Sequence, residues 1–449
     1  MRSPPHVIFI LTDTLRHDYA EKLRKTLSRE GFVEHEYAVT PSPWTVPAHA
    51  SIFTGEYPII HGVHETKTRK GFDVKFKRRN LLIDELARLG YTSHLISANA
   101  FIRPELGFNE FDRFWDIYPK RPISLLSKEE ESYLESILGI SGHRNTLLVK
   151  KLLSEGKFRL LMKLPLHYPL NRLHAIYKSK LQNWPINKGS KKAVKILEHL
   201  QFKKPQFIFM NLMEVHLPLF SGKQIPFVEN FKNNELDTAV LSKWRSSYYR
   251  ASEYLAGNIE RMLEVLKEKG VFESSLIIVC SDHGELIGEH GKVQHGTFLY
   301  DELLRVPLFI RYPTGHDRFP LPPSDEPLSL TVLPSLILSV ATNRKEPGTT
   351  FQRAVFSESY GVHVEVNTST LSREELKTYL NFEKYRIAVY YRNFKGIFNV
   401  TDWKFESVSS NDSETEVDGE VVKILKNEIV RFLKTATIAK FPKPRLNDL

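Results

Sequence analysis

Short apolar runs alternate with helical patterns along this chain, and that alternation limits the possible folds more than any other feature. The patterns predict buried strands over 7–11, 92–97, 207–212 and 276–280, and helices over 80–89 and 248–269. With 449 residues, of which 41% are hydrophobic, the chain can bury a large core. Strands that alternate with helices favour an α/β fold with a doubly wound, mostly parallel sheet.

Polar side chains follow three of these predicted strands. They are Asp13 after the first strand, His216 after the third, and the pair Asp282-His283 after the fourth. In doubly wound sheets, ligands bind at the carboxyl ends of the strands. The sequence therefore predicts that these residues converge on one site.

The segment 43–55 predicts the start of a helix. Pro47 lies just inside the expected start, where its missing N–H costs nothing, so Thr45 is expected at the exposed N-terminal end. Free backbone N–H groups and the helix dipole at such an end favour an anion such as phosphate or sulfate. The alternative is that Thr45 is an ordinary N-cap.

A catalytic role for Thr45 needs an activating group beside it, because a threonine hydroxyl is a weak nucleophile until a base or a metal ion lowers its pKa. Carboxylate oxygens and an imidazole suit a divalent metal ion that keeps an open position for the hydroxyl oxygen. The predicted metal ligands are Asp13, Thr45, Asp282 and His283. A single Asp after a strand is more often a helix cap, so this prediction depends on the joint pattern.

Three segments carry a family resemblance: Leu11-Thr12-Asp13-Thr14-Leu15-Arg16-His17-Asp18, Thr45-Val46-Pro47-Ala48-His49-Ala50-Ser51-Ile52-Phe53-Thr54-Gly55 and Ser281-Asp282-His283-Gly284-Glu285-Leu286-Ile287-Gly288-Glu289-His290-Gly291. They resemble the motifs of the sulfatase family within the alkaline phosphatase superfamily. The resemblance continues in the same order through His295-Gly296, 299–302 and 305–308, and it covers residues 1–345. It implies a metal-dependent ester hydrolase or transferase.

The second motif departs from the family pattern, which begins Cys/Ser-x-Pro-x-Arg and whose first residue is oxidised to formylglycine. Alignment of 50–55 places Thr45 at the nucleophile position and His49 at the arginine position. Threonine cannot become formylglycine by that route, so no formylglycine is expected. Threonine nucleophiles at this position resemble those of superfamily members that act on phosphate esters. We therefore predict that the protein acts on phosphate mono- or diesters.

Two alternatives remain beside this prediction. The first is a sulfuric ester hydrolase, in which Thr45 attacks sulfur without a formylglycine. The second is a noncatalytic protein that binds an anionic glycan or lipid in the same pocket. Under all three hypotheses the ligand is anionic. It is an ester in the two enzymatic hypotheses, and a glycan or a lipid can carry the anionic group.

The resemblance also implies roles for three histidines and for the metal. His216 and His295 are expected to bind substrate and to act in catalysis by donating a proton, and His49 is expected to bind substrate. Thr14 and His283 stand where many sulfatases carry Asp and Asn. Fewer oxygen ligands and one imidazole favour Mn²⁺, Zn²⁺ or Mg²⁺ over Ca²⁺.

A basic, helical insertion is predicted over 119–200 within the catalytic domain 1–345. Between 143 and 193 it carries twelve Lys and Arg residues against the single Glu155. The segment 144–192 predicts either peripheral contact with an anionic membrane or a solvated lid over the active site. Nucleic-acid binding is not expected, because no recognition motif accompanies the charge.

The remaining 346–449 predict a smaller α+β subdomain, with strands over 354–358 and 386–391, a polar loop over 407–415 and a helix over 421–434. The single cysteine, Cys280, excludes an internal disulfide. No leader pattern and no stretch of ~20 apolar residues is present in this sequence. The prediction is a cytoplasmic protein, with attachment to the inner membrane face as the alternative.

Overall fold

The computed structural model of the protein describes residues 4–76, 81–119, 125–127, 129–130, 133–134, 145–166, 183–222, 224–232, 234–343, 353–411 and 415–436. The chain divides into two compact units, Pro119–Asn187 and the rest of the chain. The predicted division into 1–345 and 346–449, with an insertion over 119–200, stays a prediction. Parts of that insertion, 120–124, 135–144 and 167–182, lie outside the described residues.

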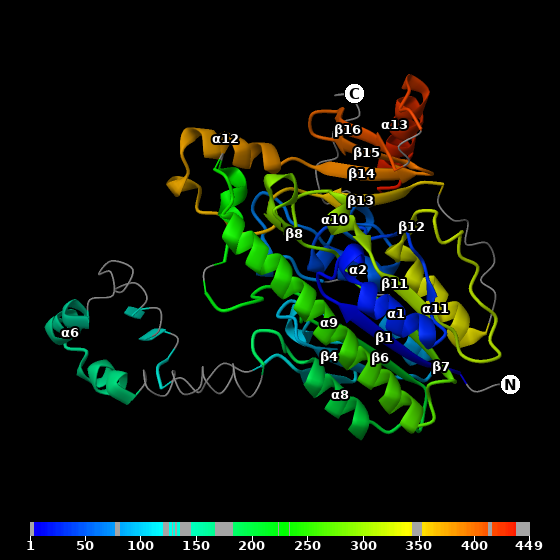
Figure 1. Ribbon diagram of the computed structural model, residues 1–449, viewed down its shortest axis with the longest axis horizontal. Coiled ribbons are helices and arrows are strands. Elements are labelled where there is room, and N and C mark those ends of the chain that lie inside the picture. The colour runs from blue at the N-terminus through cyan, green and yellow to red at the C-terminus, as the bar shows by residue number, and fades with distance from the viewer. Residues whose placement is uncertain are drawn as a thin grey trace. The chain divides into compact units, whose positions relative to one another are not determined.

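A seven-stranded sheet forms the centre of the larger unit, with the strand order β2-β11-β7-β1-β6-β4-β5 (Figure 1). The strands are β1 (His6–Thr12), β2 (Val33–Glu34), β4 (Thr92–Ser97), β5 (Arg113–Asp116), β6 (Gln206–Leu212), β7 (Ser275–Cys280) and β11 (Leu308–Arg311). The five from β7 to β5 are parallel, whereas β11 pairs antiparallel with both β7 and β2. The predicted fold class, an α/β fold with a mostly parallel doubly wound sheet, is confirmed.

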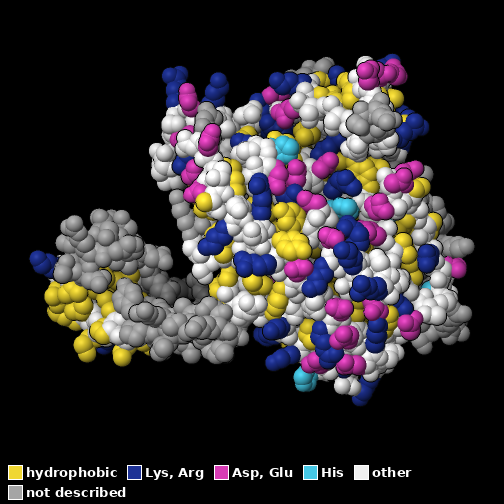
Figure 2. Space-filling view, in the orientation of Figure 1, with side chains coloured by type: hydrophobic (Ala, Val, Ile, Leu, Met, Phe, Trp, Pro, Cys, Tyr) yellow, Lys and Arg dark blue, Asp and Glu magenta, His cyan; other side chains and the backbone are white. Residues whose placement is uncertain are grey.

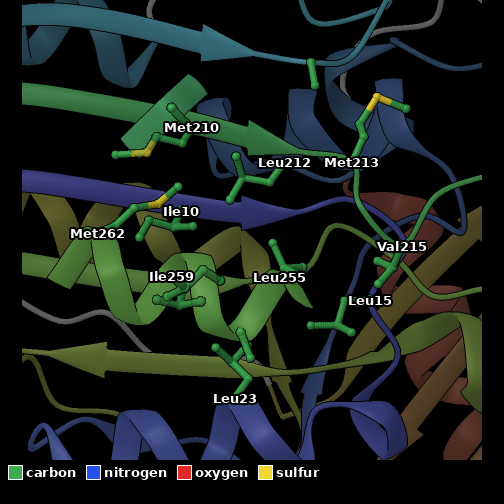
Figure 3. Packing of buried hydrophobic residues seen from close by; sticks show 14 of the residues in the cluster. Ile10, Leu15, Leu23, Met210, Leu212, Met213, Val215, Leu255, Ile259 and Met262 are labelled. Carbon is green, nitrogen blue, oxygen red and sulfur yellow. The ribbon is translucent and has the colours of Figure 1, made fainter. Parts of the chain in front are cut away.

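Helices cover both faces of this sheet because successive residues of the central strand point to opposite faces. Ile8 and Ile10 of β1 pack with residues of α1 (Glu21–Arg29), α8 (Ser190–His199) and α9 (Thr238–Glu268). Figure 3 shows part of this layer, in which Ile10 lies near Met210, Ile259 and Met262. The alternate residues of β1 pack with α2 (Thr45–Thr54), α4 (Leu82–Arg88) and α11 (Leu333–Thr342). The strand is therefore apolar throughout.

Two predicted helices differ at their ends from the observed ones. The helix predicted over 248–269 begins ten residues earlier, at Thr238, where the Asp237 side chain accepts hydrogen bonds from the backbone of Ala239 and Val240. The helix predicted over 80–89 is α4, and Asn80 lies outside the described residues. Capping by Asp237 was the sequence signal for the earlier start.

The C-terminal part of the larger unit contains a four-stranded antiparallel sheet, in the order β13-β14-β15-β16. Its elements are β13 (Val355–Ser359), β14 (Arg386–Tyr391), β15 (Phe394–Asn399), β16 (Lys404–Ser410), α12 (Arg373–Phe382) and α13 (Gly419–Lys434). Leu425, Ile429 and Phe432 of α13 pack with Ile387 and Val389 of β14. The polar loop predicted over 407–415 was wrong at its start, because 407–410 continue β16 as an exposed edge strand.

Short elements connect these layers. They are β3 (Ala38–Val39), β10 (Arg305–Val306) and β12 (Leu328–Ser329) in one small sheet, β8 (Leu286–Ile287) and β9 (Val293–Gln294) in another, and the helices α3 (Pro58–His61) and α10 (Asp301–Leu304). In the described parts of the chain, we find no helix with the length and apolar content needed to cross a bilayer.

The unit Pro119–Asn187 has a small core of its own. It contains α6 (Asn145–Ser154) and a second helical segment over 158–166. The buried side chains of this core are Leu126, Leu134, Leu148, Leu152, Leu160 and Leu164. The helical character predicted for this region agrees with these two segments.

Candidate active site

Two strand ends bring three potential metal ligands together. In the parallel pairing of β1 with β7, Leu11 lies opposite Cys280, so Asp13 and Asp282 each follow two residues after this pair. Asp13, Asp282 and His283 are fully buried, and each offers a ligand atom within 4.8 Å of the others. The structure thus brings together the three residues that the sequence places after these strands.

Backbone and amide donors hold the two carboxylates but leave one oxygen of each free to bind an ion. The N–H groups of Thr14 and His283 donate to Oδ1 of Asp282, at 3.2 and 3.0 Å. The amide of Asn99 donates to Oδ2 of Asp13 at 2.5 Å. Among the described residues, Oδ1 of Asp13 and Oδ2 of Asp282 have no hydrogen-bond partner although they are buried.

The electrostatics of this cluster favour a cation. Burial and the neighbouring charge of Asp13 raise the pKa of Asp282 well above its ordinary value. Burial lowers the pKa of His283 well below its ordinary value. Two buried carboxylates beside a neutral imidazole leave local negative charge that a divalent ion would balance. The donor set of the site therefore fits a divalent metal ion.

Thr45 lies beside this cluster at the first residue of α2. Its hydroxyl oxygen is 3.2 Å from Nε2 of His283. Nδ1 of the same ring donates to the Gly284 carbonyl at 2.9 Å, which leaves Nε2 as the acceptor for the Thr45 hydroxyl. A hydroxyl at a helix N-terminus and a buried carboxylate pair therefore face the same point.

Two expectations about Thr45 were wrong. Trp44, not Thr45, occupies the N-cap position, and α2 begins two residues before Pro47. Thr45 is also only 3% exposed, whereas the sequence predicts an exposed helix end. The reason is tertiary, because His283 in the loop after β7 contacts Thr45 at the helix terminus.

His49 lies one turn further along α2 and is fully buried. Its Nδ1 donates to the Thr45 carbonyl at 2.9 Å, and its Nε2 accepts from the Asn211 amide at 3.0 Å. Burial lowers the pKa of His49 to about 4, so the ring is neutral. A contact between His49 and substrate, as the sequence predicts, would require one of these hydrogen bonds to be exchanged.

His216 and His295 lie against the metal-ligand cluster. The centres of their rings are 5.3 Å apart, and the His295 ring is 4.5 Å from that of His283. Nδ1 of His216 donates to the Leu217 carbonyl at 2.9 Å. The structure therefore brings both predicted histidines to the same site.

A buried carboxyl group lies beside Nδ1 of His295. Glu285 is fully buried, and its carboxyl oxygen lies 3.2 Å from Nδ1 of His295. Burial raises the pKa of Glu285 to about 8, and burial lowers the pKa of His295 to about 3. At neutral pH a protonated Glu285 donates to Nδ1 of a neutral His295. That arrangement places the ring proton of His295 on Nε2.

Sequence reasoning missed three further residues near the site. His363, after β13, has its ring 5.5 Å from that of His295, and it packs so closely that a Cβ on Gly296 would lie 2.1 Å from its Nδ1. The Lys188 ammonium is fully buried and donates to the Glu214 carbonyl at 2.9 Å. Burial lowers its pKa to about 7 despite the charges of Glu214 and Asp13. The third is Asn99, and its signal was a polar residue just after the strand predicted over 92–97.

Comparisons with known proteins agree with this geometry. A family model described as Sulfatase matches residues 5–342. An arylsulfatase of Clostridium perfringens is 23% identical over 356 residues, which are 69% of this chain and 69% of the relative.

Solved structures share the fold over nearly the whole chain. A phosphonate monoester hydrolase from Silicibacter pomeroyi superposes with a TM-score of 0.57 at 15% identity, covering 97% of this chain and 95% of the other. A 2-O GAG sulfatase superposes with a TM-score of 0.61 at 12% identity, covering 97% and 93%. At such low identity these superpositions show the fold alone. The same fold occurs in a phosphonate monoester hydrolase and in a sulfatase, so it does not determine which ester is cleaved.

Proposed function

The chain belongs to the sulfatase family, and on that premise we propose that it cleaves phosphate mono- or diesters with Thr45 as the nucleophile. Its relatives support a hydrolase of this superfamily. The observation that carries the finer proposal is the Thr45 hydroxyl, 3.2 Å from His283 and beside two buried carboxylates.

Sulfatase-family enzymes use a divalent metal ion, and Asp13, Asp282 and His283 form a fitting ligand cluster with Thr45 beside it. The ion would lower the pKa of the threonine hydroxyl and neutralise charge on the ester. Mn²⁺, Zn²⁺ and Mg²⁺ suit this mixed oxygen and nitrogen set, and Ca²⁺ suits it less well.

The protein's own residues account for the remaining steps. The hydroxyl of Thr45 releases its proton to solvent, its oxygen forms a bond to phosphorus, and the bond from phosphorus to the leaving oxygen breaks. The leaving oxygen takes a proton from Nε2 of His295 or from His216, and solvent returns a proton to that ring. The phosphothreonine ester is then cleaved by a water molecule, which gives hydrolysis, or by an alcohol, which gives transfer.

The choice of phosphate over sulfate depends on residue 45. Threonine does not supply the hydrated aldehyde that formylglycine offers, so a Thr45 ester must be cleaved by direct attack. Sulfate-ester hydrolysis is the second candidate, because the family and the arylsulfatase relative favour it. A noncatalytic binding role has less support, since the family's enzymes and the intact cluster point to catalysis.

The substrate class is an anionic ester, and a glycan carrier is part of the proposal because one structural neighbour is described as a GAG sulfatase. Cytoplasmic placement remains a prediction from the sequence.

Turnover of three model esters tests this proposal. We would assay p-nitrophenyl phosphate, bis-p-nitrophenyl phosphate and p-nitrophenyl sulfate with Mn²⁺, Zn²⁺, Mg²⁺ and Ca²⁺. Thr45→Ala should abolish cleavage of the phosphate esters, whereas Thr54→Ala, at the other end of α2, should retain it. Cleavage of the sulfate ester alone would replace the proposal with the second candidate. Activity that survives Thr45→Ala would refute the nucleophile.

A further inference from the structure

Hydrophobic side chains on the unit Pro119–Asn187 form an exposed stripe at helical spacing. Its members, with their exposed fractions, are Val149 (39%) and Leu153 (47%) on α6, and Phe158 (60%), Met162 (78%) and Leu166 (68%) on the segment 158–166. A spacing of four residues places neighbours on the same side of a helix. We call these five residues the apolar stripe.

The apolar stripe is separate from the face that holds the unit together. The side chains that form the core of these two segments are Leu148, Leu152, Leu160 and Leu164, and all four are buried. Figure 2 shows hydrophobic side chains gathered on the surface around α6. Large exposed apolar patches mark contact with a partner or a membrane. The stripe is therefore a candidate surface for contact with a partner or a membrane.

Cations alternate with the stripe residues along the sequence. Residues 145–166 contain five Lys and Arg residues against Glu155 alone. Two of the five have local contacts: Lys163 pairs with Glu130 at 2.8 Å, and Lys157 lies 3.6 Å from the Tyr133 ring centre.

The other three cations are Lys150, Lys151 and Arg159, and all three are exposed. Within the described ranges they form no ion pair. The stripe therefore lies beside positive charge that a partner can neutralise.

An anionic bilayer fits this combination better than a second copy of the chain. Apolar side chains enter the boundary between head groups and acyl chains, while long cationic side chains reach the phosphates. Two stripes facing each other would instead bring like charges together. We propose that the apolar stripe and its three cations bind the surface of an anionic lipid membrane. This binding does not depend on the proposed esterase chemistry.

Vesicle binding of the full-length protein tests the proposal. The probes are vesicles of phosphatidylglycerol and phosphatidylcholine in equal parts, and vesicles of phosphatidylcholine alone. The variant Phe158→Ser/Met162→Ser/Leu166→Ser should bind the anionic vesicles about 100-fold more weakly. Its control, Leu89→Ser/Leu380→Ser/Val417→Ser, changes exposed hydrophobic residues elsewhere and should bind like the wild type.

The cations are tested in the same assay. Lys150→Gln/Lys151→Gln/Arg159→Gln should weaken binding to the anionic vesicles about 100-fold and should leave the weak binding to phosphatidylcholine unchanged. The matched control is Lys22→Gln/Arg29→Gln/Lys426→Gln, whose residues are exposed on other helices.

Three results would overturn the proposal. One is a wild-type protein that does not bind the anionic vesicles, and another is binding that both triple variants retain. The third is a wild-type dimer in the absence of lipid that the stripe variant does not form, because the stripe would then be a contact between copies. Ester turnover is measured separately on soluble substrates, so failure of this proposal and failure of the proposed function are distinguishable.

Discussion

Replacement of Asp282 by asparagine should stabilise the metal-free protein and weaken the effect of metal removal on its stability. Asp13 and Asp282 are fully buried, with ligand atoms within 4.8 Å. Two like charges at that separation repel by about 3 kcal/mol at an effective dielectric constant of about 20. Asp282→Asn removes one charge and keeps an oxygen that can accept from the Thr14 and His283 N–H groups. The metal-free variant should therefore be more stable than the metal-free wild type, by up to about 3 kcal/mol.

The pH dependence of this difference has a definite sign. Burial and Asp13 raise the pKa of Asp282 well above its ordinary value. At low pH the folded wild type holds the proton and the repulsion is absent. As the pH rises through the raised pKa, the wild type loses stability and the variant does not. The advantage of the variant should accordingly grow with pH.

Urea unfolding with EDTA and with Mn²⁺ measures both effects. A metal ion at about 100 times its dissociation constant should stabilise the wild type by about 2.7 kcal/mol and the variant by much less. Asp325→Asn, at an exposed position, is the control and should behave like the wild type. The reasoning is refuted if metal-free Asp282→Asn is less stable than the wild type and Mn²⁺ stabilises both equally.

Two further predictions concern other buried carboxyl groups. Glu285→Gln should keep kcat within about threefold, because an amide can still donate to Nδ1 of His295. Glu285→Leu should lower kcat about 10- to 100-fold. Equal losses of kcat in the two variants, measured by steady-state kinetics, would instead assign an anionic role to Glu285. Burial raises the pKa of Glu358, which accepts hydrogen bonds from Tyr360 and Tyr385, to about 7. Because the unfolded carboxyl ionises near 4.5, the wild type should lose up to about 3 kcal/mol of stability as the pH rises to 7, and Glu358→Gln should not. Urea unfolding at pH values below and above this window checks it, and a pH-independent difference between the two proteins would contradict it.

The central part of the fold was predictable because apolar runs mark its strands. The parallel register of β1 and β7 then accounts for the position of Asp13 opposite Asp282, a placement that follows from where each run ends. By contrast, β2 has two residues, of which Val33 is exposed, and its position at the sheet edge has no periodic signal. Propensity also failed at 407–410, where pairing with β15 makes a strand of a polar segment.

The candidate site was predictable only where its residues follow strands or stand in the family motifs. Lys188 becomes fully buried through its contact with the Glu214 carbonyl, and a basic segment of sequence gives no sign of that. His363 reaches His295 because Gly296 leaves room for its ring, which is a contact between distant segments. The burial of Thr45 also depends on loops that come together only in the folded chain. Tertiary packing, rather than local pattern, decided these features.

Mass analysis of acid-quenched enzyme during turnover of bis-p-nitrophenyl phosphate tests the central claim most directly. The account predicts that the peptide containing Thr45 gains the mass of the transferred phosphoryl ester, with fragmentation that places it on Thr45, and that Thr45→Ala gains none. An unmodified Thr45 peptide during active turnover, together with full activity of Thr45→Ala, would contradict the claim.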